Sequence, residues 1–297
     1  MNYTETLAVV CKFCGSKNVV KNGQMHGNQY YLCHTCGHTF AGNDALPGMR
    51  YPPEQIAAAL QAFYEGLSLR AIQRQLATES GAMPSDSTVY EWVVRFSKVA
   101  AAKASGYKAQ TGKIWAADET VLDVAGGRTK EGSPNTVWYW DVIDEDSRFL
   151  LASHMSLTRT IRDAEALFTQ ARGRAENAPH FIVTDRLRSY IDGIERVWGG
   201  DVLHIQSEGM APATHNNTIE RFHGSIKQRT KVMRGMQNRE TAKIIMDGWL
   251  VHYNFFRPHE GLGGKTPGEV ARVGFPYKSW RDMVTQGYHR QLVKVTG

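Results

Sequence analysis

All four cysteines of the chain lie in two Cys-x-x-Cys-Gly pairs, and this spacing strongly constrains how the first forty residues can fold. The pairs are Cys11 with Cys14 and Cys33 with Cys36, and eighteen residues (15–32) separate them. The spacing is typical of a zinc site in which each pair occupies a tight turn and the following glycine adopts a positive φ. Four thiolates complete such a site, so the zinc would be structural rather than catalytic.

The residues between the pairs predict two strands joined at Asn22-Gly23, which gives a zinc ribbon over residues 1–42. A ribbon this small cannot hold a core without metal. The alternatives are two disulfides or free thiols. The chain has no membrane-length apolar run and no signal-peptide pattern, so we expect a cytoplasmic protein. Disulfides are rare in that compartment, which argues against the first alternative. Whether the ribbon binds DNA or another subunit stays open.

Residues 43–105 predict a domain of three short helices. The first follows Pro52-Pro53, Ser68 caps the second, and a residue of 85–87 caps the third. Apolar residues recur at helical spacing, namely Ile56, Leu60, Phe63, Leu67, Ile72, Leu76, Val89, Trp92, Val93 and Phe96. The tight second turn favours a helix-turn-helix whose third helix binds DNA through Tyr90, Arg95 and Lys98. A plain three-helix bundle is the alternative.

Residues 106–272 predict a mixed α/β sheet of the ribonuclease-H-like kind. Three strands joined by turns form an antiparallel meander, and helices then alternate with strands. The expected strands are the one around Asp118, 136–143, 149–153, 180–183 and 202–205, and the expected helices are 161–174, 188–198 and one beginning near 216. We expect residues 273–297 to be a C-terminal tail, and the sequence does not place it.

Three acidic residues occupy separate settings in this segment. Asp118 lies within a strand, Asp185 ends an apolar strand, and Glu220 opens a basic helix, with thirty-four residues (186–219) between Asp185 and Glu220. Strand alternation predicts that Asp118 and its neighbour Glu119 point to opposite faces, so only one of them can enter a common site. Each acid also has a structural alternative. Asp118 could be an exposed strand residue, Asp185 could be the N-cap of the next helix, and Glu220 could form a capping box with Asn217.

If folding brings these acids together, each like-charged pair at about 4 Å costs roughly 4 kcal/mol at an effective dielectric near 20. Divalent cations remove that repulsion and can hold both reacting oxygens of a phosphodiester. The acids therefore indicate metal-dependent chemistry on nucleic acid.

The chain carries a formal charge of +6, and its basic residues gather around Glu220. Those of residues 214–257 are Arg221, Lys227, Arg229, Lys231, Arg234, Arg239, Lys243 and Arg257. Helical spacing places Asn216, Asn217, Glu220, Gly224 and Lys227 on one face. That face offers a carboxylate for metal and a cation for phosphate, and a solvated helix face is the alternative.

These motifs resemble the DDE transposases of bacterial insertion sequences, whose catalytic core is similar to that of retroviral integrases. The matching runs are Trp115–Thr120, Val183–Asp185, Asn216–Lys227 and Tyr253–His259 with Leu262 and Thr266-Pro267, within residues 112–272. The resemblance implies that Asp118, Asp185 and Glu220 bind two Mg²⁺ or Mn²⁺ ions and catalyse DNA cleavage and strand transfer. It also implies that Lys227 contacts the DNA end. Tyr190 fits the family pattern, but we assign it no catalytic role.

The implied partners are double-stranded DNA, as terminal inverted repeats and as target, and a second copy of the chain in a homodimer or higher oligomer. No membrane partner is expected. Lys231 and Arg234 would follow the DNA phosphates. His223 is expected to be an ordinary helix-surface residue. Two other functions remain open: a DNA-binding regulator with a non-catalytic core, and a ribonuclease-H-like nuclease that cuts without joining.

Overall fold

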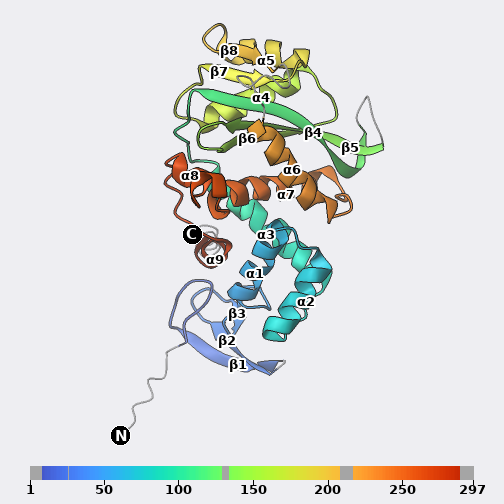
Figure 1. Cartoon of the computed structure of the whole chain (residues 1–297). Helices are drawn as coiled ribbons and strands as arrows, with labels where there is room; N and C mark the ends of the chain where they lie inside the picture. Colours follow the sequence, from blue (N-terminus) through green and yellow to red (C-terminus); the bar gives the residue numbers. More distant parts are fainter. Residues whose placement is uncertain (1–8, 26, 129–133, 208–216, 288–297) are drawn as a thin grey trace.

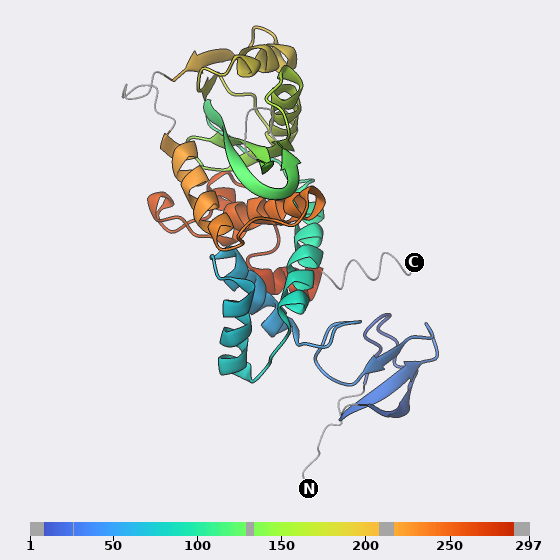
Figure 2. The ribbon, with the colours of Figure 1, turned by 90° about the vertical axis from the view of Figure 1, so that its right-hand side faces the viewer.

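The computed structural model describes residues 9–25, 27–128, 134–207 and 217–287, without the side chains of Arg128 and Asn217. A three-stranded sheet lies at one end of the molecule and a five-stranded sheet at the other, with helices between them (Figure 1). Figure 2 shows the same order from the side. Asn216, and the side chain of Asn217 with its expected capping box, lie outside the described residues.

The N-terminal sheet is antiparallel and consists of β1 (Val19–Met25), β2 (Asn28–Cys33) and β3 (Thr39–Ala41). Its own buried cluster holds only Cys11, Cys33 and Phe40, against which Phe13 and Tyr31 pack. So small a core supplies little stability by itself.

The three predicted helices are present as α1 (Pro53–Tyr64), α2 (Leu69–Ser80) and α3 (Asp86–Ala104). Ser68 accepts a hydrogen bond from the Ala71 amide, and Ser85 accepts one from the Thr88 amide, so both are N-caps. Gly81 ends α2 with a φ of 68°. The predicted inward residues of α3 (Val89, Trp92, Val93 and Phe96) are buried.

The five-stranded sheet has the order β6-β5-β4-β7-β8. Its strands are β4 (Ile114–Arg128), β5 (Pro134–Asp144), β6 (Leu150–Ser156), β7 (Phe181–Thr184) and β8 (Leu203–Gln206). The first three form the predicted antiparallel meander, and β7 and β8 add in parallel. This is a mixed, ribonuclease-H-like sheet, as the sequence predicts.

Helices cover both faces of this sheet (Figure 1 and Figure 2). One pair is α4 (Ile161–Arg174) and α5 (Arg188–Trp198), and the other is α6 (Asn217–Lys231) and α7 (Arg239–Val251). Trp115 of β4 contacts Trp198 of α5 at 5.9 Å between ring centroids. On α6, Ile219, Phe222 and Ile226 are buried, which gives the helix one apolar face.

The chain after α7 returns to the helical part of the molecule. Its elements are η1 (His252–Phe256), η2 (Glu260–Leu262), α8 (Pro267–Val270), α9 (Trp280–Asp282) and η3 (Met283–Gly287). Asn254 bonds both the amide and the carbonyl of Leu150 with its side chain, at 2.8 and 2.9 Å. The indole of Trp280 stacks on Tyr64 of α1, with 5.1 Å between centroids. The tail that the sequence does not place is therefore part of the core up to Val284.

One buried apolar cluster runs from Leu46 to Val284, so the helices and the five-stranded sheet share a core. The division of the chain at residues 42, 105 and 272 stays a prediction. Within the described residues, no helix combines the length and apolar character that a membrane span requires.

Candidate active site

The site forms where β4 continues past the end of its neighbour β7. The two strands pair only from Ile114 with Phe181 to Ala116 with Val183. Asp118 and Glu119 follow on β4 beyond this paired segment, and Asp185 comes directly after β7. The parallel arrangement thus brings acids from two strands to the same edge.

The carboxylates of Asp118, Glu119 and Asp185 lie within 4.8 Å of one another. The prediction that Asp118 and Glu119 cannot both enter one site is therefore wrong. Their side chains do leave β4 on opposite faces, since Asp118 contacts α6 and Glu119 contacts α5. Because β7 has already ended, no neighbouring strand separates them, and both reach Asp185 around the free edge.

Burial of these acids makes their charges costly. Burial raises the pKa of Glu119, and the charges of Asp185 and Asp118 raise it further, while a hydrogen bond from Tyr190 acts in the opposite direction. Burial also raises the pKa of Asp185, and the charge of Asp118 adds to this effect. Carboxylate oxygens are the ligands that Mg²⁺ prefers, so the donor set fits a divalent cation.

Asp185 is not the N-cap of α5, which was its structural alternative, because Leu187 occupies that position. Its Oδ1 accepts a hydrogen bond of 2.9 Å from the amide of Leu187, which is the N-cap residue of α5. This bond fixes one oxygen of the carboxylate, and the other oxygen remains for a cation. The hydrogen bond to Leu187 orients Asp185 just before α5 and is compatible with cation binding.

On the α5 side, Glu119 is held by two side chains. The Tyr190 hydroxyl donates to Oε2 at 2.7 Å, and Arg159 Nη1 donates to Oε1 at 3.3 Å. The guanidinium of Arg159 in turn stacks on Trp138 at 4.2 Å. Only 4% of the Glu119 side chain is exposed. The family pattern drew attention to Tyr190, and its contact with Glu119 is something that the sequence does not reveal.

On the α6 side, Asp118 contacts His223, which is buried rather than on the helix surface as expected. His223 Nδ1 lies 3.3 Å from Asp118 Oδ2, and Nε2 lies 3.0 Å from Asp141 Oδ2. Burial lowers the pKa of His223, but hydrogen bonds to Asp118 and Asp141 outweigh it and raise the pKa to about 9. Burial raises the pKa of Asp141, and His223 opposes this rise.

Glu220 lies one turn before His223 on α6 and is exposed. It does not join the group of carboxylates that lie within 4.8 Å of one another. Thus the structure brings together two of the three predicted catalytic acids and places the third on the adjoining helix. Gly224 and Lys227 are exposed on the same helix, and the predicted face that they share with Glu220 stays a prediction.

The predicted DNA-binding residues fall at two places. Lys231 and Arg234 are exposed and line a groove of about 1000 Å³ between α6 and the helices α1 to α3. Tyr90 of α3 lines the same groove. Arg95 and Lys98 lie further along α3 and are exposed, and Arg95 Nη1 contacts Met49 Sδ at 3.8 Å.

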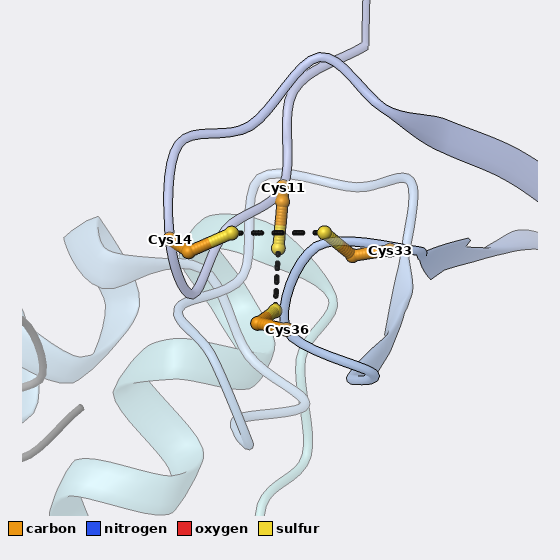
Figure 3. Close-up of side chains that lie close together, drawn as sticks. All are labelled: Cys11, Cys14, Cys33 and Cys36. Carbon is orange, nitrogen blue, oxygen red and sulfur yellow. Dashed lines mark hydrogen bonds between the residues drawn. The ribbon is translucent and has the colours of Figure 1, made fainter.

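The four cysteine sulfurs form a second compact cluster (Figure 3). Cys11 Sγ lies 3.6 Å from Cys36 Sγ, and Cys14 Sγ lies 3.6 Å from Cys33 Sγ. None of the four is in a disulfide. Tetrahedral zinc with bonds near 2.3 Å separates its sulfurs by about 3.8 Å, so this cluster could hold one zinc ion.

Comparison with known proteins gives one family. Residues 112–259 match a family model described as a DDE domain, of the IS240 transposase type. None of the curated proteins matches the chain.

Solved structures of viral integrases resemble the chain at low identity. The catalytic core of HTLV-2 integrase in complex with magnesium is 17% identical, covering 55% of this chain and 99% of that chain, with a TM-score of 0.41. The catalytic core of BIV integrase is 16% identical, covering 54% and 93%, with a TM-score of 0.39. A simian T-cell lymphotropic virus intasome, in complex with PP2A regulatory subunit B56 gamma, is 12% identical and covers 72% of each chain, with a TM-score of 0.41.

Proposed function

Residues 112–259 belong to the DDE-domain family of IS240-type transposases, the catalytic core of a polynucleotidyl transferase, and from this membership we propose that the protein is a DNA transposase. It cleaves the ends of a mobile DNA element and joins them to target DNA. One observation carries the proposal: the segment that matches the family holds Asp118, Asp185 and Glu220.

Asp118, Asp185 and Glu220 are the proposed metal-binding acids, and Glu119 adds negative charge beside them. When bound, two Mg²⁺ or Mn²⁺ ions supply Lewis-acid activation of water and of the 3′-OH and stabilise the charge of an in-line displacement. Glu220 stands on an exposed face of α6, and its carboxylate would complete the set of metal ligands. The Tyr190 and Arg159 hydrogen bonds keep Glu119 oriented throughout.

The chemistry needs no external energy source. Water first displaces the 3′-oxygen of a phosphodiester at the element end, which leaves a 3′-OH and a 5′-phosphate. The 3′-OH then displaces the 3′-oxygen of a target phosphodiester, so one P–O bond forms as another breaks. Each step exchanges one bond for a similar bond.

We further propose that the rest of the chain binds DNA. Helices α2 and α3 act as a helix-turn-helix, with Tyr90, Arg95 and Lys98 on the terminal repeats. Lys227 contacts the DNA end, and Lys231 and Arg234 contact phosphates beside the groove. The four cysteines hold a structural zinc ion, and the active form is a homodimer or higher oligomer on paired ends.

The test is cleavage and strand transfer on DNA that carries the terminal inverted repeats flanking the gene. We expect Asp185→Asn to abolish both reactions while DNA affinity stays nearly unchanged. Asp192→Asn, on the neighbouring helix α5, is the control and should keep both reactions. Joining by Asp185→Asn would refute the catalytic assignment. Wild-type protein that cuts but cannot join pre-cleaved ends would identify a nuclease instead.

A further inference from the structure

Asp118 and Asp141 are a directly opposed pair of acids on adjacent strands. They face each other in the register of β4 with β5, so both side chains lie on the same face of the sheet. Like charges at such positions repel and destabilise the pairing. Asp141 is fully buried and Asp118 partly so, which makes the repulsion stronger than it would be in water.

His223 lies between these two acids. Because each ring nitrogen faces a carboxylate oxygen, at 3.3 Å and 3.0 Å, both can donate when the ring is an imidazolium. Asp141 is itself oriented, since Ser153 Oγ donates to its Oδ1 at 2.6 Å. A chain of contacts thus runs from Ser153 on β6 through Asp141 and His223 to Asp118.

His223 contacts only one oxygen of Asp118, and the second oxygen is left for a cation. The ring therefore sets the direction of the carboxylate without blocking it. A buried ring of this kind holds its partner better than a surface side chain can, because packing restricts its rotation.

The same residue also fixes the helix that carries Glu220. His223 follows Glu220 by three residues, which is nearly one helical turn. A second anchor lies at the start of α6, where Thr218 Oγ1 donates to Glu145 Oε2 at 2.6 Å. Between them, these contacts set the position of the first turn of α6 against β4 and β5, and so the place from which Glu220 reaches the cluster.

We propose that His223 is a positioning residue that orients the metal-binding carboxylate of Asp118 and sets the register of the helix that carries Glu220. The proposal rests on the proposed function. Asp141 supports His223 from behind. Loss of such supporting partners typically costs about 10- to 100-fold in metal affinity or activity.

The experiment compares His223→Ala, His223→Gln and Asp141→Asn with wild type. His154→Gln is the matched control, because His154 also pairs with an acid, Asp163 at 3.4 Å, away from the cluster. Mn²⁺ affinity is measured by calorimetry on the protein alone. The Mg²⁺ dependence of cleavage and the affinity for DNA are measured in parallel.

We expect about 10-fold weaker Mn²⁺ binding and a similar rise in the Mg²⁺ needed for half-maximal cleavage in His223→Ala. His223→Gln keeps a hydrogen-bond donor, so its Mn²⁺ affinity and its Mg²⁺ requirement should lie between those of His223→Ala and wild type. DNA affinity should not change in either variant. Equal Mn²⁺ affinity in folded His223→Ala would overturn the proposal. So would tighter Mn²⁺ binding, because the ring would then compete with the cation.

If His223→Ala does not fold, His223→Gln and Asp141→Asn are compared with wild type in its place. Weaker Mn²⁺ binding in these variants supports the positioning role, and Mn²⁺ affinity equal to that of wild type overturns it. Wild-type protein that binds Mn²⁺ but never cleaves would count against the transposase function while leaving the positioning role testable by calorimetry. The two failures are therefore distinguishable.

Discussion

The hydroxyl of Tyr190 donates a 2.7 Å hydrogen bond to Oε2 of Glu119, and this bond joins α5 to the edge of β4 where the acids gather. Tyr190 is fully buried and packs against Trp140 at 5.4 Å. A buried carboxylate that lacks such a donor carries an uncompensated charge. The bond therefore stabilises both the fold and the orientation of Glu119.

We predict that Tyr190→Phe lowers the free energy of unfolding by about 1–3 kcal/mol, because it removes a donor from a buried charged group. Urea unfolding at neutral pH measures the change. Tyr107→Phe is the control, since the Tyr107 ring packs on Phe275 and its hydroxyl makes no hydrogen bond among the described residues. An equal loss in both variants would show that the Tyr190 hydroxyl has no special role.

Much of this architecture follows from local patterns in the sequence. The strand alternation of β4, the helical spacing of α1 to α3 and the paired cysteines all depend on neighbours a few residues away. The wrong expectation at Glu119 came from applying alternation to β4 alone. Whether two faces can meet depends on where β7 ends beside β4, and no local pattern contains that information.

The same reason explains His223 and the tail. His223 was expected on the helix surface, yet its side of α6 packs on β4 and β5, where its ring contacts Asp118 and Asp141. Trp280 stacks on Tyr64, which belongs to the first helix of the chain. Contacts between residues this distant in sequence need the tertiary structure before they can be seen.

We predict that the cysteine cluster holds one zinc per chain and that Cys14→Ser loses it. Zinc content by mass spectrometry should fall, and proteolysis should then cut within residues 9–41, because this part has almost no other core. The helices and the five-stranded sheet should keep their melting temperature, since they share a separate core. Freshly purified wild type without zinc would refute the site.

We predict that His252 makes the fold acid-sensitive. Burial lowers its pKa, against the opposing effect of Glu65, and its Nδ1 accepts a hydrogen bond of 3.2 Å from Trp280 Nε1, so the folded state holds the neutral ring. Its folded pKa lies below the unfolded value near 6.5. The unfolded state therefore binds more protons in acid, and stability falls as the pH drops below about 6.5.

The measurement is urea unfolding at several pH values between 8 and about 5, for wild type and for His252→Gln. Glu65, whose pKa His252 lowers below its ordinary value of 4.5, stays largely ionised over this range in both proteins, so the difference between the two curves reports mainly on His252. The advantage of wild type should shrink as the pH falls. Parallel curves would contradict the prediction.

We predict that Lys231→Gln weakens binding to every DNA sequence by a similar factor, because the proposed role of Lys231 is a contact with phosphates rather than bases. The slope of log affinity against log salt should fall by about 0.9 for one lost contact. Lys243→Gln is the control, since Lys243 is exposed on α7 but already paired with Asp247 at 2.7 Å. A selective loss for the terminal repeats would indicate a base contact instead.

Replacing Arg229 is expected to raise the free energy of unfolding, whereas Tyr190→Phe is expected to lower it. Its side chain is 4% exposed, its guanidinium stacks on Phe63 at 3.8 Å, and its three nitrogens have no hydrogen-bond partner among the described residues. Burial lowers its pKa to about 10. A buried cation without an anionic partner costs more than its contact with one aromatic ring returns.

We therefore expect Arg229→Met to increase the free energy of unfolding by about 1–3 kcal/mol, because methionine fills much of the same space without charge. Urea unfolding measures this, and Arg221→Met, at an exposed position of the same helix, should change little. A loss of stability in Arg229→Met would mean that the guanidinium has a partner in solution, either water or an anion such as a DNA phosphate. DNA affinity measured on the same variant separates these cases, because only pairing with DNA makes it fall.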